Sequence, residues 1–207
     1  MVGGITWRGW SSLLLACGLA VGVLGVTLSQ VRYHPQTDEA YYFKYAQAVA
    51  QEGVGALPRL FEEHLQNDSV NRYFPAPTRL TTTFLGAAAI KLLGNHPRSL
   101  SKLSIVAFLV LLVVMFVGLF RSFGELTACW AIVLLAVSPL SLGLAQRALA
   151  DGVACTLFLS CLWGVLWAFG KGQMPAWRWG GLSVLFGVTF LSKEITLSLI
   201  PITWAFL

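Results

Sequence analysis

The residues with the most evident chemical potential are two adjacent carboxylates, Asp38 and Glu39, which follow a long apolar run. Pro35 and Thr37 precede them. Because proline is excluded from helix interiors and threonine is a common N-cap, we expect a helix to begin here. Both carboxylates then lie in its first turn, where free N–H groups and the helix dipole favour negative charge. Such a carboxylate can accept a proton from a hydroxyl or hold a cation; the alternative is a capping pair on a surface helix.

Two further groups of charges occur at the edges of apolar runs, where ionisable side chains are costly and need a partner or a role. Arg147 and Asp151 are four residues apart, and Lys193 and Glu194 are adjacent within an apolar segment. The structural interpretation is an i,i+4 ion pair for the first group and a loop between short helices for the second. The functional interpretation is a polar wall at the membrane surface, with Asp151 and Glu194 as supporting residues or metal ligands.

Phosphate binding is the chemistry that the basic residues of these segments suggest. Four of them are candidates: Arg72, Arg79, Arg147 and Lys193. Guanidinium and ammonium groups bind phosphate oxygens, and guanidinium often does so through two parallel hydrogen bonds. We therefore expect these side chains to clamp a donor phosphate close to a carboxylate that acts as a base.

Composition sets the class of protein that must position these groups. Of 207 residues, 57% are hydrophobic and 11% are charged, whereas soluble domains carry about 25% charged residues. The net charge of +5 comes from basic residues scattered singly between apolar runs, so it does not indicate nucleic-acid binding. The four cysteines lie within apolar runs without metal-ligand spacing, which argues against a zinc site or a disulfide framework. The sequence therefore predicts an all-α, polytopic transmembrane helical protein.

The apolar runs predict how the chain crosses the membrane. The first, 10–31, is long enough to span a bilayer, and the poor cleavage site after it favours a retained helix over a signal peptide. Residues 32–79 hold six of the nine acidic residues. We expect there an extracytoplasmic loop with an amphipathic helix over 38–52 and a second short helix over 58–66. Over 80–207 we expect further spans: a short run 80–94, then 103–120, 126–145, 149–170 and 179 onward.

The short run 80–94 decides which charges share a face of the membrane. If it makes no net crossing, three basic residues fall on the cytoplasmic side, as the positive-inside rule requires: Arg121, Lys171 and Arg178. All candidate site charges then gather on the opposite face. If it crosses fully, the acidic candidates are divided between the two faces. We prefer the first arrangement, although Arg98 and Lys102 count against it.

Four motifs follow one another along the chain: Asp38-Glu39-Ala40-Tyr41-Tyr42; Phe74-Pro75-Ala76-Pro77-Thr78-Arg79 with Lys91-Leu92-Leu93-Gly94; Ser138-Pro139-Leu140 with Arg147 and Asp151; and Leu191-Ser192-Lys193-Glu194. Their order and spacing resemble the N-terminal half of polyprenyl-phosphate-sugar-dependent glycosyltransferases of the GT-C fold. The closest group is the dolichyl-phosphate-mannose protein mannosyltransferase-like one (glycosyltransferase family 39, with ArnT-like and RgtA/B/C/D-like enzymes). One departure is Phe74, which stands where the family has a phosphate-facing lysine.

The resemblance implies transfer of a sugar from a polyprenyl-phosphate-linked donor to a hydroxyl of a protein, lipid or glycan acceptor, with inversion, at the extracytoplasmic face. Asp38 would be the base that deprotonates the acceptor, with Glu39 as the second catalytic candidate. Arg147 and Lys193 would stabilise the departing phosphate. Asp151 would pair with Arg147, or help to hold a divalent cation (Mg²⁺ or Mn²⁺) alongside Asp38 or Glu39. Metal use varies across the GT-C fold, so no cofactor is assigned.

Family members are usually at least twice as long, so we expect residues 1–207 to be the N-terminal part of such a membrane domain, from a fragment or a truncated gene product. The expected location is a bacterial inner (plasma) membrane with the site facing outside. The alternative is a non-catalytic or degenerate integral membrane protein, such as a transporter-like or scaffold fragment. A transporter would place its charges near the midplane and usually show an internal repeat, whereas these charges cluster at span ends.

Overall fold

The computed structural model describes residues 6–28, 37–67, 74–148, 150–169, 175–193 and 201. Within these ranges every regular element is helical, which confirms the all-α class. The elements are α1 (Trp7–Leu28), α2 (Asp38–Glu52), a 3-10 turn η1 (Gly53–Gly55), α3 (Ala56–Gln66), α5 (Leu80–Leu93), α6 (Arg98–Phe123), α7 (Glu125–Val137), α8 (Pro139–Gln146), α9 (Ala150–Phe169) and α10 (Ala176–Phe190).

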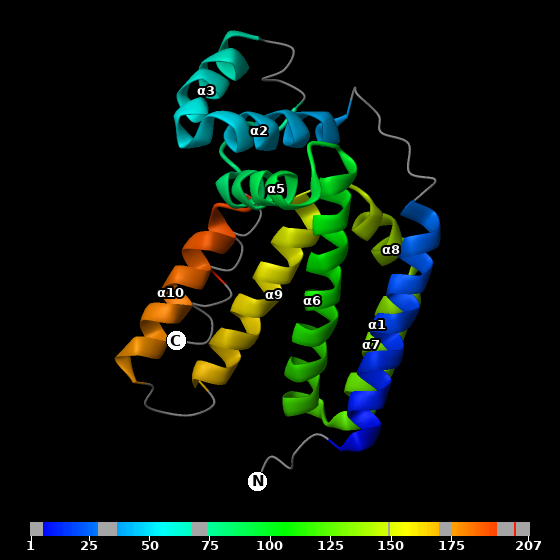
Figure 1. Cartoon of the computed structure of the whole chain (residues 1–207). Coiled ribbons are helices and arrows are strands. Elements are labelled where there is room, and N and C mark those ends of the chain that lie inside the picture. The colour runs from blue at the N-terminus through cyan, green and yellow to red at the C-terminus, as the bar shows by residue number, and fades with distance from the viewer. Residues whose placement is uncertain are drawn as a thin grey trace.

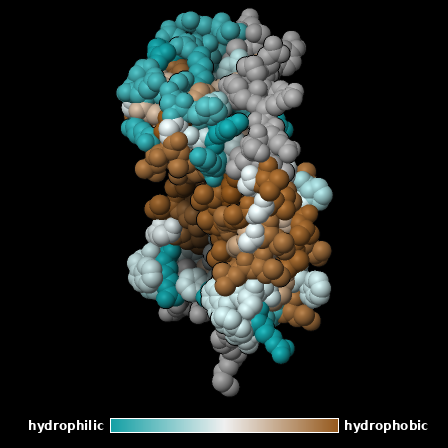
Figure 2. All heavy atoms as spheres, turned by 45° about the vertical axis from the view of Figure 1, so that its right-hand side comes forward, coloured by the Kyte–Doolittle hydropathy of each residue, from teal (hydrophilic) through white to brown (hydrophobic). Residues whose placement is uncertain are grey.

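Three of these helices are long and apolar enough to cross a membrane: Trp7–Val26, Arg98–Phe123 and Ala150–Ala168. In Figure 2 the side chains along the long helices form a broad hydrophobic band, and hydrophilic side chains gather at the end of the molecule where α2 and α3 lie. This distribution is compatible with the predicted membrane protein, because only the apolar band suits a bilayer interior.

The span predicted over 126–145 is broken. Helices α7 and α8 meet at an angle of 59°. Ser138 lies between them with an extended backbone, and its side chain accepts a hydrogen bond from the Ser141 backbone N–H. Pro139 follows at the first position of α8, where its missing N–H costs nothing. Serine as N-cap and proline as first residue thus start a new helix and interrupt the predicted continuous one.

Helices α2, α3 and α5 lie crosswise over one end of the long helices (Figure 1). Helix α2 covers the predicted range and ends at Gly53, whose φ of 75° is left-handed and suits glycine. Helix α3 begins two residues before the predicted start, because Pro58 is tolerated within its first turn. The crosswise placement of α5 agrees with the prediction that 80–94 makes no net crossing.

Small side chains allow the long helices to approach one another. Ala16 and Ala20 of α1 and Ala128 and Ala136 of α7 are fully or almost fully buried, in one cluster with Phe116 of α6. Alanines four or eight residues apart lie on one face of a helix, and small residues at such spacing bring helix backbones close within a membrane. This packing holds α1, α6 and α7 together beneath the site.

Candidate functional site

The candidate site lies where four parts of the chain meet at one end of the bundle. They are the first turn of α2, the beginning of α5, the turn between α8 and α9, and the residues that follow α10 (Figure 1). A buried apolar cluster joins α2, the end of α5, α6 and the turn between α8 and α9: Tyr42, Ala46, Ile90, Leu100, Ala148 and Ala150. The carboxylates of α2 are therefore positioned by packing against the turn that carries Arg147 and Asp151.

Glu39 and Arg147 form an ion pair. The Arg147 Nε atom donates to Glu39 Oε1 at 2.6 Å. Glu39 is only 5% exposed, whereas the Arg147 side chain is 49% exposed. The i,i+4 pair with Asp151 that the spacing suggested does not form, because α8 ends before Arg147 and the backbone there is extended (φ −87°, ψ 145°). Because no single helix runs through both residues, they do not share the helix face that such a pair requires.

Asp151 instead forms an ion pair with Lys193. Lys193 lies three residues after the last residue of α10, and α5 fixes the end of that helix. The Thr81 backbone N–H donates to the Leu191 carbonyl at 3.1 Å, and its hydroxyl donates to the Val188 carbonyl at 2.7 Å. The sequence reasoning overlooked Thr81, although a run of threonines at the start of an apolar segment was the available signal.

Arg79 donates a hydrogen bond to the Tyr42 hydroxyl and places its guanidinium carbon 5.7 Å from the centre of the ring. Burial raises the pKa of Tyr42 to about 12, Arg79 opposes that shift, and Asp38 and Asp151 add to it. These influences show that Asp38, Arg79 and Asp151 all lie within electrostatic range of one hydroxyl. Tyr42 was not among the predicted site residues; its place one turn after Asp38 was the available signal.

Asp38 differs from the other two carboxylates of the site. It lies half-buried in the first turn of α2, and within the part of the chain that the structure describes its side chain forms no hydrogen bond or ion pair. Thr37 occupies the N-cap position, but its side chain makes no capping hydrogen bond. Asp38 therefore retains its full capacity to accept a proton or a hydrogen bond, whereas Glu39 and Asp151 are neutralised by cations.

Two of the predicted site residues, Arg72 and Glu194, lie outside the described residues. Among the residues that are described, no three side chains of His, Cys, Asp or Glu gather closely enough to hold a metal ion. The divalent cation was predicted at Asp151 with Asp38 or Glu39, and Glu194 was a further candidate ligand. Asp151 and Glu39 each bind a basic side chain, and the described residues do not test the prediction of a metal.

Comparison of the chain with known protein families, with curated proteins and with solved structures finds no match. The resemblance to the GT-C glycosyltransferases consequently rests on the four motifs, and a function must be argued from the geometry of the site.

Proposed function

We propose that this chain carries the acceptor-activating and phosphate-binding parts of a membrane glycosyltransferase site, which uses a polyprenyl-phosphate-linked sugar. The observation that supports this most directly is the carboxylate of Asp38, which has no partner among the described residues and lies at the end of the bundle that also carries Arg79, Arg147 and Lys193. A base and several cations at one end of the molecule form the combination that transfer from a phosphate donor requires.

In the proposed reaction, Asp38 accepts the proton of the acceptor hydroxyl. The acceptor oxygen attacks the anomeric carbon from the face opposite the phosphate, and the bond between that carbon and the phosphate oxygen breaks. The phosphate leaves with the electron pair, and its additional negative charge is stabilised by Arg147 and Lys193. Attack from the opposite face inverts the anomeric configuration. No step uses a metal ion.

Glu39 and Asp151 have a positioning role in this proposal. Each carboxylate holds one of the phosphate-binding cations, Arg147 and Lys193 respectively. Because Arg147 remains half-exposed while Glu39 is buried, the pair fixes the guanidinium without removing all its donors from solvent. A preorganised cation stabilises developing charge without reorganising during the reaction.

The location also suits a lipid-linked donor. The site lies at the boundary between the hydrophobic band of the long helices and the hydrophilic end of the molecule (Figures 1 and 2). A polyprenyl chain would remain in the bilayer while its phosphate reaches the cations at the boundary. From the resemblance we infer that this end faces the outside of a bacterial inner membrane.

A non-catalytic membrane protein is the second candidate. It is favoured by the two ion pairs, since a structural network that joins α2 to the α8–α9 turn and α10 would contain the same contacts. The two candidates differ at Asp38, because a scaffold has no use for a carboxylate that none of the described side chains binds.

The deciding experiment compares Asp38→Asn with Glu62→Gln in the full chain, reconstituted with polyprenyl-phosphate-linked hexoses and a hydroxyl acceptor. Glu62 is an exposed carboxylate on α3 and provides a matched control for loss of one charge. Loss of a general base should lower kcat by about 10²–10⁴-fold, and the control should retain wild-type turnover. Equal turnover by both variants, or no transfer by the wild-type chain with any donor, would contradict the proposal.

A further inference from the structure

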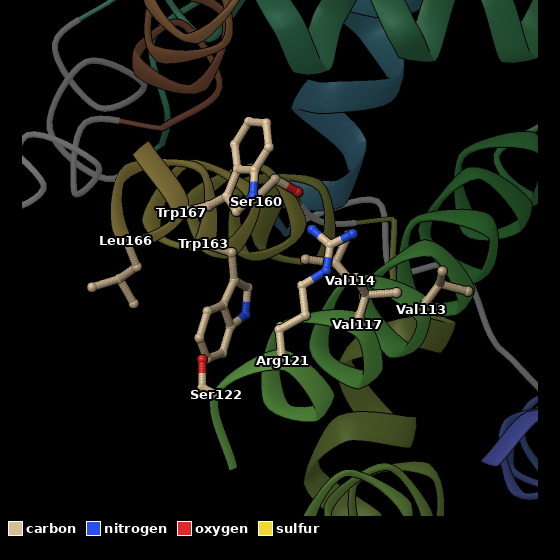
Figure 3. Close-up of a pocket in the computed structure, with 10 residues that line it drawn as sticks. Val113, Val114, Val117, Arg121, Ser122, Ser160, Trp163, Leu166 and Trp167 are labelled. Atoms are coloured by element: carbon tan, nitrogen blue, oxygen red, sulfur yellow. The ribbon is translucent and has the colours of Figure 1, made fainter. Parts of the chain in front are cut away.

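A large cavity lies far from the candidate site, in the other half of the bundle. It has a volume of about 760 Å³ and is formed between α6 and α9, with Val113, Val117 and Arg121 on one side and Trp163 and Trp167 on the other (Figure 3). Arg121 is in the last turn of α6, whereas Arg98 begins that helix near the candidate site. At 1.5 Å per residue, about 35 Å of helix separate the two arginines.

Gly118 gives the cavity its shape. A Cβ atom at this position would lie 2.2 Å from the Trp163 ring, so only glycine lets the indole lie against α6. The indole N–H of Trp163 is buried and has no hydrogen-bond partner within the described residues. Buried polar groups are nearly always satisfied, and an unsatisfied donor on a cavity wall therefore indicates a missing acceptor.

Arg121 supplies a positive charge at the same cavity. Its guanidinium extends from α6 toward α9 in Figure 3. None of the described residues that line the cavity is acidic, and the described part of the chain contains no ion pair of Arg121. The cavity therefore combines an unneutralised cation, an unsatisfied N–H donor and walls of valine and tryptophan.

The basic and aromatic character continues beyond Trp167. A neighbouring cavity of about 270 Å³ shares this residue, and Arg178 lies there with its guanidinium carbon 4.8 Å from the Trp167 ring centre. The Nε atom of Arg178 is also buried without a partner among the described residues. Tryptophan and arginine together are typical of the membrane interface, where aromatic rings lie at headgroup level.

We propose that the cavity between α6 and α9 binds an anionic phospholipid. The phosphate would accept hydrogen bonds from the Arg121 guanidinium and the Trp163 indole. The parts of the acyl chains next to the headgroup would lie along Val113 and Val117. Basic pockets between membrane helices bind anionic headgroups in this way. A zwitterionic lipid is a poorer occupant, because its own cation would meet a site without an acidic residue. This binding site is independent of the proposed glycosyltransferase reaction.

The test uses the full chain in nanodiscs of phosphatidylcholine. A second lipid with brominated acyl chains is added, either phosphatidylglycerol or further phosphatidylcholine, and the two are compared. Quenching of tryptophan fluorescence measures lipid binding. Arg121→Gln is compared with Arg98→Gln, an exposed arginine at the opposite end of the same helix. Since one charge-assisted contact is worth about a factor of ten in affinity, Arg121→Gln should weaken phosphatidylglycerol binding about tenfold, and Arg98→Gln should leave it unchanged.

Trp163→Phe is the second variant, since it keeps the ring and removes the N–H donor. It should lower the preference for phosphatidylglycerol over phosphatidylcholine, measured by native mass spectrometry of retained lipid. Three results would each overturn the proposal: equal quenching by the two lipids, equal binding by Arg121→Gln and Arg98→Gln, or quenching that is displaced by raising the protein concentration. The last result would show that a second copy of the chain covers the cavity.

Discussion

The Arg147 Nε atom lies 2.6 Å from Glu39 Oε1, although 108 residues separate the two in the sequence. This contact joins the turn between α8 and α9 to the first turn of α2. Because Glu39 is buried and the neighbouring Asp38 makes no such contact within the described residues, the pair divides two adjacent carboxylates into different roles. In the proposed reaction, Glu39 anchors a cation and Asp38 acts as the base.

The two members of this pair should differ in their effect on stability. Arg147→Met leaves a buried carboxylate without its partner, whereas Glu39→Gln leaves an arginine that is half-exposed and can be hydrated. We expect Arg147→Met to lower the free energy of unfolding by about 1–3 kcal/mol and Glu39→Gln to lower it by less. Unfolding of the purified chain in mixed detergent micelles measures both values.

The double variant with Glu39→Gln and Arg147→Met is the control for this asymmetry. With the buried charge removed, Arg147→Met should cost less in the Glu39→Gln background than in the wild type. Strictly additive effects would show that the two side chains do not interact in solution.

The second ion pair allows structure and phosphate binding to be separated. Exchanging the charges of Asp151 and Lys193 keeps an ion pair but moves the cation from the end of α10 to the first turn of α9. The double exchange should recover most of the stability that Lys193→Asp loses alone. Sugar transfer should remain low, because the cation no longer lies where the phosphate departs. If the double exchange recovered both stability and sugar transfer, both would depend on the ion pair alone and not on the position of the cation.

Local signals were sufficient to predict much of the fold. The limits of α2 follow from the polar residues around Thr37 at its start and from Gly53 at its end. The crosswise α5 follows from an apolar run too short to span a bilayer. The break at Ser138 was missed because the run 126–145 is uncharged and mostly apolar, and its hydropathy then outweighed the serine and proline signal.

The partners within the site could not be predicted in the same way. Arg147 and Asp151 have the spacing of an ion pair only if one helix continues through both, and α8 ends before Arg147. Their true partners, Glu39 and Lys193, are distant in sequence and are brought close by helix packing. The order of motifs suggested that these charges meet, but only the tertiary structure shows which carboxylate has no partner among the described residues.

Tyr42 should make stability depend on pH above the neutral range. Burial raises its pKa to about 12, above the usual value near 10 of an unfolded chain. The folded state therefore binds the phenolic proton more tightly, so this contribution is complete below about pH 10 and is lost as pH rises through about 12. The difference in unfolding free energy between the wild type and Tyr42→Phe should decrease by up to about 2 kcal/mol over this range.

Tyr45→Phe on the same helix is the companion variant for that titration. Burial also raises the pKa of Tyr45 above its usual range, and the neighbouring Tyr42 adds to that rise, so the wild-type slope contains two coupled contributions. Tyr42→Phe and Tyr45→Phe should each reduce the slope above pH 10, and the double variant should reduce it further. A slope that Tyr42→Phe does not reduce would show that its hydroxyl is solvated rather than buried against Arg79.

The close approach of α2 to α5 should depend on a single glycine. A Cβ atom at Gly86 would lie 2.9 Å from the Ala46 Cβ atom, which cannot move without its backbone. We expect Gly86→Ala to displace α2, lower the unfolding free energy by about 1–3 kcal/mol and reduce sugar transfer.

Gly143→Ala is the matched control, because nothing lies within 4 Å of its added methyl group and alanine is the better helix former. Adding Ala46→Gly to Gly86→Ala transfers the methyl from one helix to the other and should restore α2 and part of the activity. If Gly86→Ala were as stable as Gly143→Ala, α2 would not rest on α5 closely enough to position Asp38.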